Sequence, residues 1–252
     1  MKMRRMTSCT LAGCATLLVA LSADAALRAT PEFEDGSRRP VSIALIPVHA
    51  SVVKAKVVQA ESLIEESIEL GGYLAVELAA LLNDQGYAVK LLDAEQVNSD
   101  PQLQEYVVDA NRRYDEIRAQ IRRNRVKRRI YNAGNEVKLL ANYLDVDAIA
   151  FTRLQVVAAT AGRAAVALLV GIGSMGGTMA SVSLIDGNSG DLEAYMVSTA
   201  VPSYKDIEQD PASQMARIAA STLRRLPLAD PAARVELSDE EDVLSELESL
   251  LD

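Results

Sequence analysis

Several residue types are scarce in this chain of 252 residues. It contains no Trp, two Phe and one His, and both of its Cys lie within the first fourteen residues. A single His excludes histidine-rich metal sites, which need several imidazole ligands. Few aromatic residues are present, so Val, Leu, Ile and Ala must build the core. Hydrophobic residues make up 49% of the chain and charged residues 24%, which is typical of a soluble globular protein.

The N-terminus carries the pattern of an export signal. Three basic residues precede an uncharged segment over residues 6–23, whose centre is apolar. Ala23 and Ala25 supply the small residues that a signal peptidase recognises, so we expect residues 1–25 to be a signal peptide cleaved after Ala25. The mature chain then has no Cys, which excludes thiol proteases and disulfide bonds. Its predicted location is the periplasm.

Two alternatives for this N-terminus stay open. The residues from Leu11 to Cys14 have the form of a lipobox, which would make Cys14 the lipidated residue of an anchored lipoprotein. An uncleaved signal would instead anchor the chain in the membrane by its N-terminus. The apolar segment before Cys14 is very short, which favours simple cleavage.

Charge is distributed unevenly along the chain, whose net charge is -9. Residues 236–252 hold eight acids and no basic residue, whereas residues 112–129 hold nine basic residues and two acids. The sequence therefore predicts a body of low net charge with one basic stretch and one acidic tail.

The first half of the domain follows a strand, helix, strand pattern. Residues 26–40 form a polar leader, and the β-branched run over residues 41–48 predicts a buried strand. Residues 61–85 carry apolar residues at helical spacing, which are Leu63, Ile64, Ile68, Leu74, Leu78, Leu81 and Leu82. Residues 87–92 predict a second strand, parallel to the first.

Residues 101–144 are a predicted helical insert. The apolar residues that recur there at spacings of three and four are Leu103, Val107, Ala110, Tyr114, Ile117 and Ile121. They form a narrow seam, and residues 132–135 then break the helix. A hairpin that projects from the sheet and a long helix packed across the sheet are both consistent with this pattern.

The second half of the chain predicts four further elements. They are a strand at 146–152, a hairpin of strands at 179–186 and 192–200, and a helix at 211–226. Asp210 and Pro211 are the cap and first residue of that helix. The fold class is therefore α/β, a single domain over residues 41–226 with a mixed β-sheet and packed helices.

Two short motifs resemble a cofactor site and a metal site but predict neither, and one uncharged segment has two interpretations. The glycines of residues 171–176 match a dinucleotide-binding pattern, but strand-like sequence follows where that site needs a helix. Asp186, Asn188 and Asp191 lack the Glu at position twelve of a calcium loop, so a hairpin turn is predicted. The uncharged segment 164–178 is predicted to be a loop between strands, with membrane insertion as the alternative.

No catalytic residue is predicted. His49 has no Ser, Asp or Cys at a known catalytic spacing, although a periplasmic hydrolase with an unrecognised Ser or carboxylate site stays an alternative. Arg122, Arg125 and Arg129 belong to a basic run that is typical of a solvated helix face, and the functional alternatives are that they bind a partner or an anionic lipid. No aromatic residue is interleaved for base stacking, so no nucleic acid is expected.

The acidic tail predicts a short amphipathic helix over residues 236–252, after a Pro-containing linker over 227–235. Ser238 and Glu241 form a capping box at its start. Its predicted partner-binding face consists of Leu244, Leu247 and Leu251. Either this helix folds back onto its own domain, or it docks in a partner's groove with its acids facing a basic rim.

The order of these elements resembles a superfamily of bacterial envelope accessory proteins that includes the curli-secretion lipoprotein and the penicillin-binding-protein activators. Four short motifs carry the resemblance, at residues 42–48, 86–89, 144–150 and 182–186. The basic insert and the acidic tail depart from the common pattern. The resemblance implies a non-catalytic accessory protein that binds an envelope protein partner in assembly or transport, with no catalytic residue to carry over.

Overall fold

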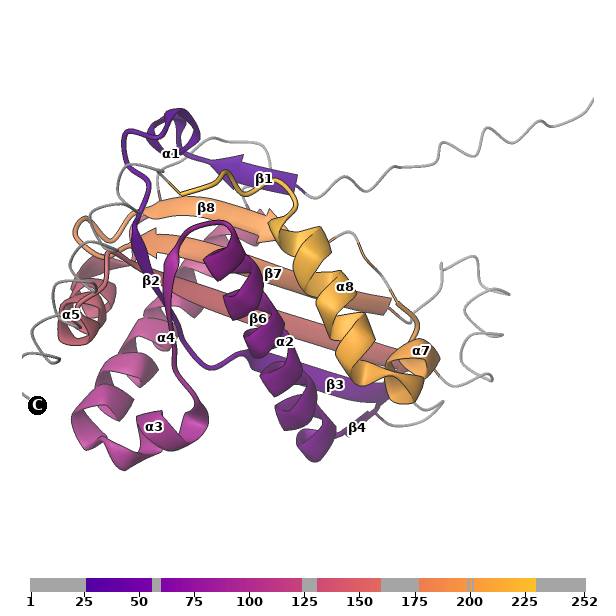
Figure 1. Ribbon diagram of the computed structural model, residues 1–252. Helices are drawn as coiled ribbons and strands as arrows, with labels where there is room; N and C mark the ends of the chain where they lie inside the picture. The colour runs from indigo at the N-terminus through magenta and orange to yellow at the C-terminus, as the bar shows by residue number, and fades with distance from the viewer. Residues whose placement is uncertain are drawn as a thin grey trace, which may run out of the picture.

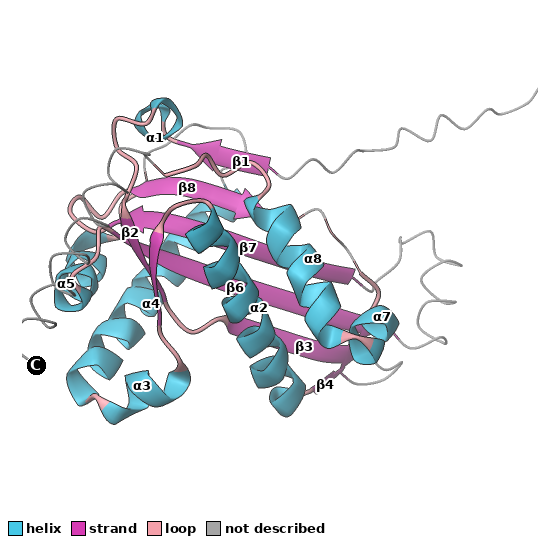
Figure 2. Cartoon of the chain, in the orientation of Figure 1, coloured by secondary structure: helices cyan, strands magenta, loops and turns pink. Residues whose placement is uncertain are grey.

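A computed structural model describes residues 26–55, 60–123, 131–159, 177–198, 200 and 202–229. They form an eight-stranded mixed sheet with helices packed on both faces (Figures 1 and 2). In chain order the elements are β1 (Ala26–Ala29), α1 (Pro31–Asp35), β2 (Ser42–Leu45), β3 (His49–Ala55), β4 (Ala60–Ser62), α2 (Ile64–Asp84), β5 (Ala88–Leu91), α3 (Ala94–Ser99), α4 (Pro101–Arg123), α5 (Gly134–Leu144), β6 (Ala148–Ala159), β7 (Gly177–Asp186), β8 (Leu192–Val197), α7 (Tyr204–Gln209) and α8 (Pro211–Leu223). The predicted α/β class with a mixed sheet and packed helices is confirmed.

The long strand β6 organises the sheet. Its first part pairs in parallel with β2, and its second part, from Arg153 to Ala159, pairs in parallel with β3. On its other edge β6 pairs antiparallel with β7, which continues to β8 and then β1. Strand β5 lies parallel to β2, which confirms the predicted strand, helix, strand unit.

The first face of the sheet is covered by α2 and α8 (Figure 1). The residues of α2 that are buried there include Leu70, Leu74, Leu78 and Leu82, at spacings of four. Helix α8 adds Met215 and Ile218, which are fully buried. Asp210 caps α8, because its side chain accepts a hydrogen bond from the Ser213 amide, and Pro211 is the first helical residue, as predicted.

The second face is covered by α4 and α5, and α4 passes behind the sheet in Figure 1. All six residues of the predicted seam, from Leu103 to Ile121, are buried. The Tyr114 ring stacks on Phe151 of β6 with centroids 4.5 Å apart, and its hydroxyl lies 2.7 Å from the Ser183 hydroxyl of β7. Helix α4 is therefore packed across the sheet and is not part of a projecting hairpin.

The leader predicted over residues 26–40 needs correction. Strand β1 pairs with β8, and α1 buries Phe33 completely against the first-face core. Thr30 caps α1 by accepting a hydrogen bond from the Phe33 amide, and Pro31 follows as the first helical residue. Both elements are too short for a periodic pattern, which is why the sequence did not predict them.

Several predicted features lie outside the described residues. They are Cys14 and Ala25 of the N-terminal segment, Arg125 and Arg129, most of segment 164–178, and Leu244, Leu247 and Leu251 of the tail. The backbone of Arg122 belongs to α4, but its side chain is likewise outside the description. Among the helices that the structure describes, none has the length and hydropathy of a transmembrane span.

Candidate functional site

A small polar cleft opens on the second face of the sheet, where the strands extend past the Tyr114 contact. The β3–β6 register places His49 beside Arg153 and Ser51 beside Gln155. Residues two apart on a strand share a face, so these four side chains gather on one side of the sheet. The cleft has a volume of about 220 Å³ and is lined by His49, Ser51, Arg118, Arg153, Leu154, Gln155 and Met179. We call it the polar cleft.

Arg153 is the most buried cation in the polar cleft, with 6% of its side chain exposed. One terminal nitrogen donates a hydrogen bond to Asp115 Oδ1 at 2.7 Å. Its guanidinium carbon lies 5.4 Å from the centre of the Tyr114 ring, in cation–π distance. The carboxylate and the ring hold the guanidinium in place at the floor of the cleft.

Arg118 enters the same cleft from α4, one turn after Asp115. Its Nε is buried, and it finds no hydrogen-bond partner among the residues that the structure describes. A buried donor without an acceptor costs free energy, so an acceptor oxygen that bound this N–H group would be stabilising.

His49 also lines the polar cleft, and the positive charges of both arginines act on its imidazole. The pKa of His49 is lowered below its ordinary value of 6.5, first by partial burial and then by the charges of Arg153 and Arg118, which Asp115 opposes in part. The imidazole is therefore neutral at neutral pH. A neutral imidazole offers one N–H donor to the cleft.

The hydrolase alternative requires a nucleophile, a base and an orienting carboxylate joined by hydrogen bonds. Ser51 and His49 are both in the polar cleft, but the carboxylate of Asp115 is bound by Arg153. Within the described ranges, no hydrogen bond joins Ser51 to His49. The hydrogen-bonded series that the hydrolase alternative requires is therefore not present among the described residues of the cleft.

The Asp186 to Asp191 segment is the predicted hairpin turn. Asp186 Oδ1 accepts hydrogen bonds from the amides of Asn188 and Ser189, and the turn joins β7 to β8. Over the residues that can be described, no group of three or more His, Cys, Asp or Glu is placed to hold a metal ion.

A second surface lies on the outer side of α2. Ile64, Ile68 and Val76 are 69%, 72% and 58% exposed. With exposed Gly72 and Ala80 they occupy every fourth position of the helix, which places them in one row. We call this row, Ile64, Ile68, Gly72, Val76 and Ala80, the α2 stripe.

Glutamates flank the α2 stripe along one side. Glu65 and Glu69 are exposed, and Glu77 is half-buried. The leucines that α2 buries lie on the opposite side of the helix. The helical spacing over residues 61–85 placed Ile64 and Ile68 with those leucines, and the second apolar row was not predicted. The signal was present, because Ile64 and Ile68 are two positions out of step with the row of leucines at 70, 74, 78 and 82, and residues two apart on a helix face different sides.

Comparison with known proteins gives similarities of fold only. No model of a known protein family matches the chain, and no curated protein matches it. It is similar to the solved PelC dodecamer of Paraburkholderia phytofirmans, with 11% identity, a TM-score of 0.40, and coverage of 82% of this chain and 99% of that one. It is also similar to lipoprotein GNA1162 of Neisseria meningitidis, with 14% identity, a TM-score of 0.30, and coverage of 70% and 97%. At these TM-scores the similarities assign neither function nor assembly to this chain.

Proposed function

We propose that this chain is an exported, non-catalytic accessory protein of the bacterial cell envelope, which binds a protein partner through the α2 stripe. The observation that supports it most directly is the exposure of Ile64, Ile68 and Val76 on a helix whose other side is already buried. Single exposed apolar residues are common, but a continuous row of them marks an interaction surface.

The shape of the α2 stripe suits a closely packed partner. A Cβ added at Gly72 would meet nothing within 4 Å, so the centre of the row is open to an approaching chain. Small residues at such positions allow two backbones to come close together. Large side chains at Ile68 and Val76 then lie on either side of this gap and provide the apolar contact.

The charges beside the α2 stripe define the chemistry of the partner. Glu65, Glu69 and Glu77 form an acidic edge, which favours a partner segment that combines aliphatic side chains with Lys or Arg. The chain's own tail, residues 236–252, would bring eight acids to this edge and is therefore disfavoured as the occupant. The export signal predicted over residues 1–25 supports the periplasm as the place where the partner is met.

Site-specific photo-crosslinking in cells tests this function. A photoreactive amino acid at position 68 or 76 is expected to give a covalent adduct with one envelope protein. The matched controls are Val108 and Leu139, which are 58% and 50% exposed on other helices. The peptide crosslinked at position 68 should contain Lys or Arg beside its aliphatic residues.

Charge reversal provides the second part of this test. Glu65→Lys combined with Glu69→Lys should reduce the adduct at position 68 by about tenfold, since a partner with basic residues is then repelled. The control Glu95→Lys combined with Glu105→Lys makes the same charge change at exposed positions of α3 and α4 and should leave the adduct unchanged. Equal adducts at positions 68, 108 and 139, or no adduct at 68 and 76, would contradict the proposed function.

A further inference from the structure

The polar cleft has more positive charge than its lining neutralises. Arg118 and Arg153 converge on it, and the carboxylate of Asp115 binds the Arg153 guanidinium. Among the described residues that line the cleft itself there is no carboxylate. One guanidinium charge is thus left without a counter-charge among the lining residues, in a place where both arginines are drawn partly out of water.

The polar cleft also has more hydrogen-bond donors than acceptors to bind them. Arg118 Nε is buried without an acceptor, and the Ser51 hydroxyl, the Gln155 amide and the His49 imidazole can each donate a further hydrogen bond. Guanidinium groups bind planar or tetrahedral oxygen anions through parallel N–H donors, and such charge-assisted hydrogen bonds are the strong ones.

We propose that the polar cleft is a binding site for an oxyanion, a carboxylate or a phosphate group, held between Arg118 and Arg153. The volume of about 220 Å³ fits one such group. It is smaller than the cavities of about 300–1,000 Å³ that enclose whole small-molecule ligands. The ligand is therefore a free ion or the charged end of a larger molecule.

Asp115 has a positioning role in this site. It holds the Arg153 guanidinium against Tyr114, and it is itself 54% exposed, so water partly screens its charge from an incoming anion. Arg118, which lines the cleft, instead offers the donors of its guanidinium to the ligand. This site goes beyond the proposed function, since it lies on the second face of the sheet and the α2 stripe belongs to a helix on the first.

His49 gives this proposal a direct readout. It is the single His of the chain, so an untagged protein shows one set of imidazole NMR signals. Sodium phosphate and sodium acetate are titrated separately at constant ionic strength, with sodium chloride as the balancing salt. A saturable shift of the His49 signals and a rise in the His49 pKa on saturation are expected, because a bound anion stabilises the imidazolium form. Saturation by phosphate alone assigns a phosphate ligand, and saturation by acetate assigns a carboxylate.

Variants on one helix separate specific binding from general charge effects. Arg118→Gln should weaken binding of the saturating anion by about tenfold or more, which corresponds to the loss of one charge-assisted hydrogen bond. Arg112→Gln removes the same charge from an exposed position of α4 and should leave the affinity within about twofold. Far-UV circular dichroism confirms that both variants are folded. No saturable response to either anion, or equal weakening by both variants, would overturn the proposal. Neither result depends on the α2 stripe.

Discussion

Ser42 and Asp147 are joined by reciprocal hydrogen bonds at the start of the two central parallel strands. The Ser42 hydroxyl donates to Asp147 Oδ2 at 3.0 Å, and the Asp147 amide donates to Ser42 Oγ at 2.9 Å. The same carboxylate oxygen accepts hydrogen bonds from the amides of Val41 and Ser42, each at 2.9 Å. The pair therefore fixes the position at which β2 meets β6, directly before the first ladder pair of Ile43 and Ala148.

The first prediction follows from this contact. Asp147→Ala should lower the free energy of unfolding by about 2–3 kcal/mol, because two backbone N–H groups and a hydroxyl lose their acceptor. Ser42→Ala should cost about 1 kcal/mol, and the double variant should cost less than the sum. Urea denaturation measures all three. The control Asp84→Ala, at an exposed helix end, should change stability by no more than about 0.5 kcal/mol, and strict additivity of the two changes would contradict a coupled pair.

The sequence predicted those elements whose own residues carry a clear local signal, such as a helix cap or an apolar repeat. The Asp210-Pro211 start of α8 is specified by cap chemistry, and the buried seam of α4 by its apolar spacing. Strands β3 and β4 were missed because His49 to Ala55 neither alternates nor forms an apolar run. The strand conformation of β3 depends on pairing with β6, which lies about a hundred residues later in the chain, and β4 in turn pairs with β3.

The polar cleft and the α2 stripe could not be predicted from the sequence, because each depends on how helices pack on the rest of the fold. Arg118 and Arg153 are separated by helix α5 in the sequence, and only the packing of α4 on β6 brings them into one cleft. On α2, apolar periodicity does not say which of two apolar rows faces the core. The packing of α8 against α2 makes that choice, and Ile64 and Ile68 are left outside.

Two glycines should respond to alanine in opposite directions. A Cβ at Gly187 would lie 2.6 Å from the Ala141 Cβ and 2.8 Å from the Asp147 carbonyl oxygen, so Gly187→Ala should destabilise the protein by about 1–3 kcal/mol. Gly72 lies in the middle of α2 with nothing within 4 Å of an added Cβ, so Gly72→Ala should stabilise by about 0.5–1 kcal/mol. Urea denaturation of the two variants provides the comparison. A destabilised Gly72→Ala would show that this side of α2 is already covered.

Glu193 should make stability fall as the pH rises above the acidic range. Its side chain is buried, the Thr30 hydroxyl donates to Oε2 at 2.6 Å, and Oε1 accepts no hydrogen bond among the described residues. Burial is the main cause of its raised pKa. A raised pKa in the folded state favours the protonated form, so the stability contribution is full below the unfolded value near 4.5 and is lost as the pH passes through the folded pKa.

Glu193→Gln tests this direction. Glutamine keeps an acceptor for Thr30 without a charge, so the variant should have the higher Tm at pH 7–8, and the two Tm values should converge near pH 4. Differential scanning calorimetry across this range measures the difference. The loss of the 3.5 Å contact with Arg38 costs little, because Arg38 is 42% exposed. A lower Tm for the variant at pH 7–8 would show that the Arg38 contact outweighs burial.

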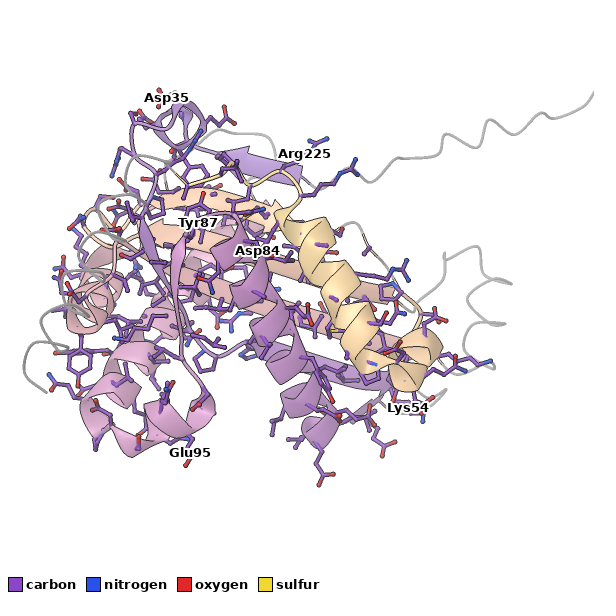
Figure 3. All side chains as sticks on the ribbon, in the orientation of Figure 1. Asp35, Lys54, Asp84, Tyr87, Glu95 and Arg225 are labelled. Carbon is purple, nitrogen blue, oxygen red and sulfur yellow. The ribbon has the colours of Figure 1, made fainter. Side chains whose placement is uncertain are left out.

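Tyr87 ties the chain after α8 to the end of α2. Its hydroxyl donates to the Pro227 carbonyl oxygen at 2.7 Å, and the Ala229 amide donates to the Gln85 carbonyl oxygen beside it. Figure 3 shows Tyr87 close to Asp84, the last residue of α2. Tyr87→Phe should therefore lower the free energy of unfolding by about 1 kcal/mol at pH 8, the contribution of one hydrogen bond.

Alkaline pH should reduce the advantage of the wild-type protein over Tyr87→Phe. Burial raises the pKa of Tyr87 to about 12 from its ordinary value of 10.0, so the folded state holds the phenolic proton more tightly than the unfolded state does. The contribution of protonated Tyr87 to the free energy of unfolding is full below pH 10 and is lost as the pH rises through 12. The Tyr87→Phe variant has no such loss. Urea denaturation at pH 8, 10 and 11.5, followed by far-UV circular dichroism, should show the wild-type advantage shrinking as the pH rises. An advantage that stays constant over this range would mean that Tyr87 ionises equally well in the folded and unfolded chains.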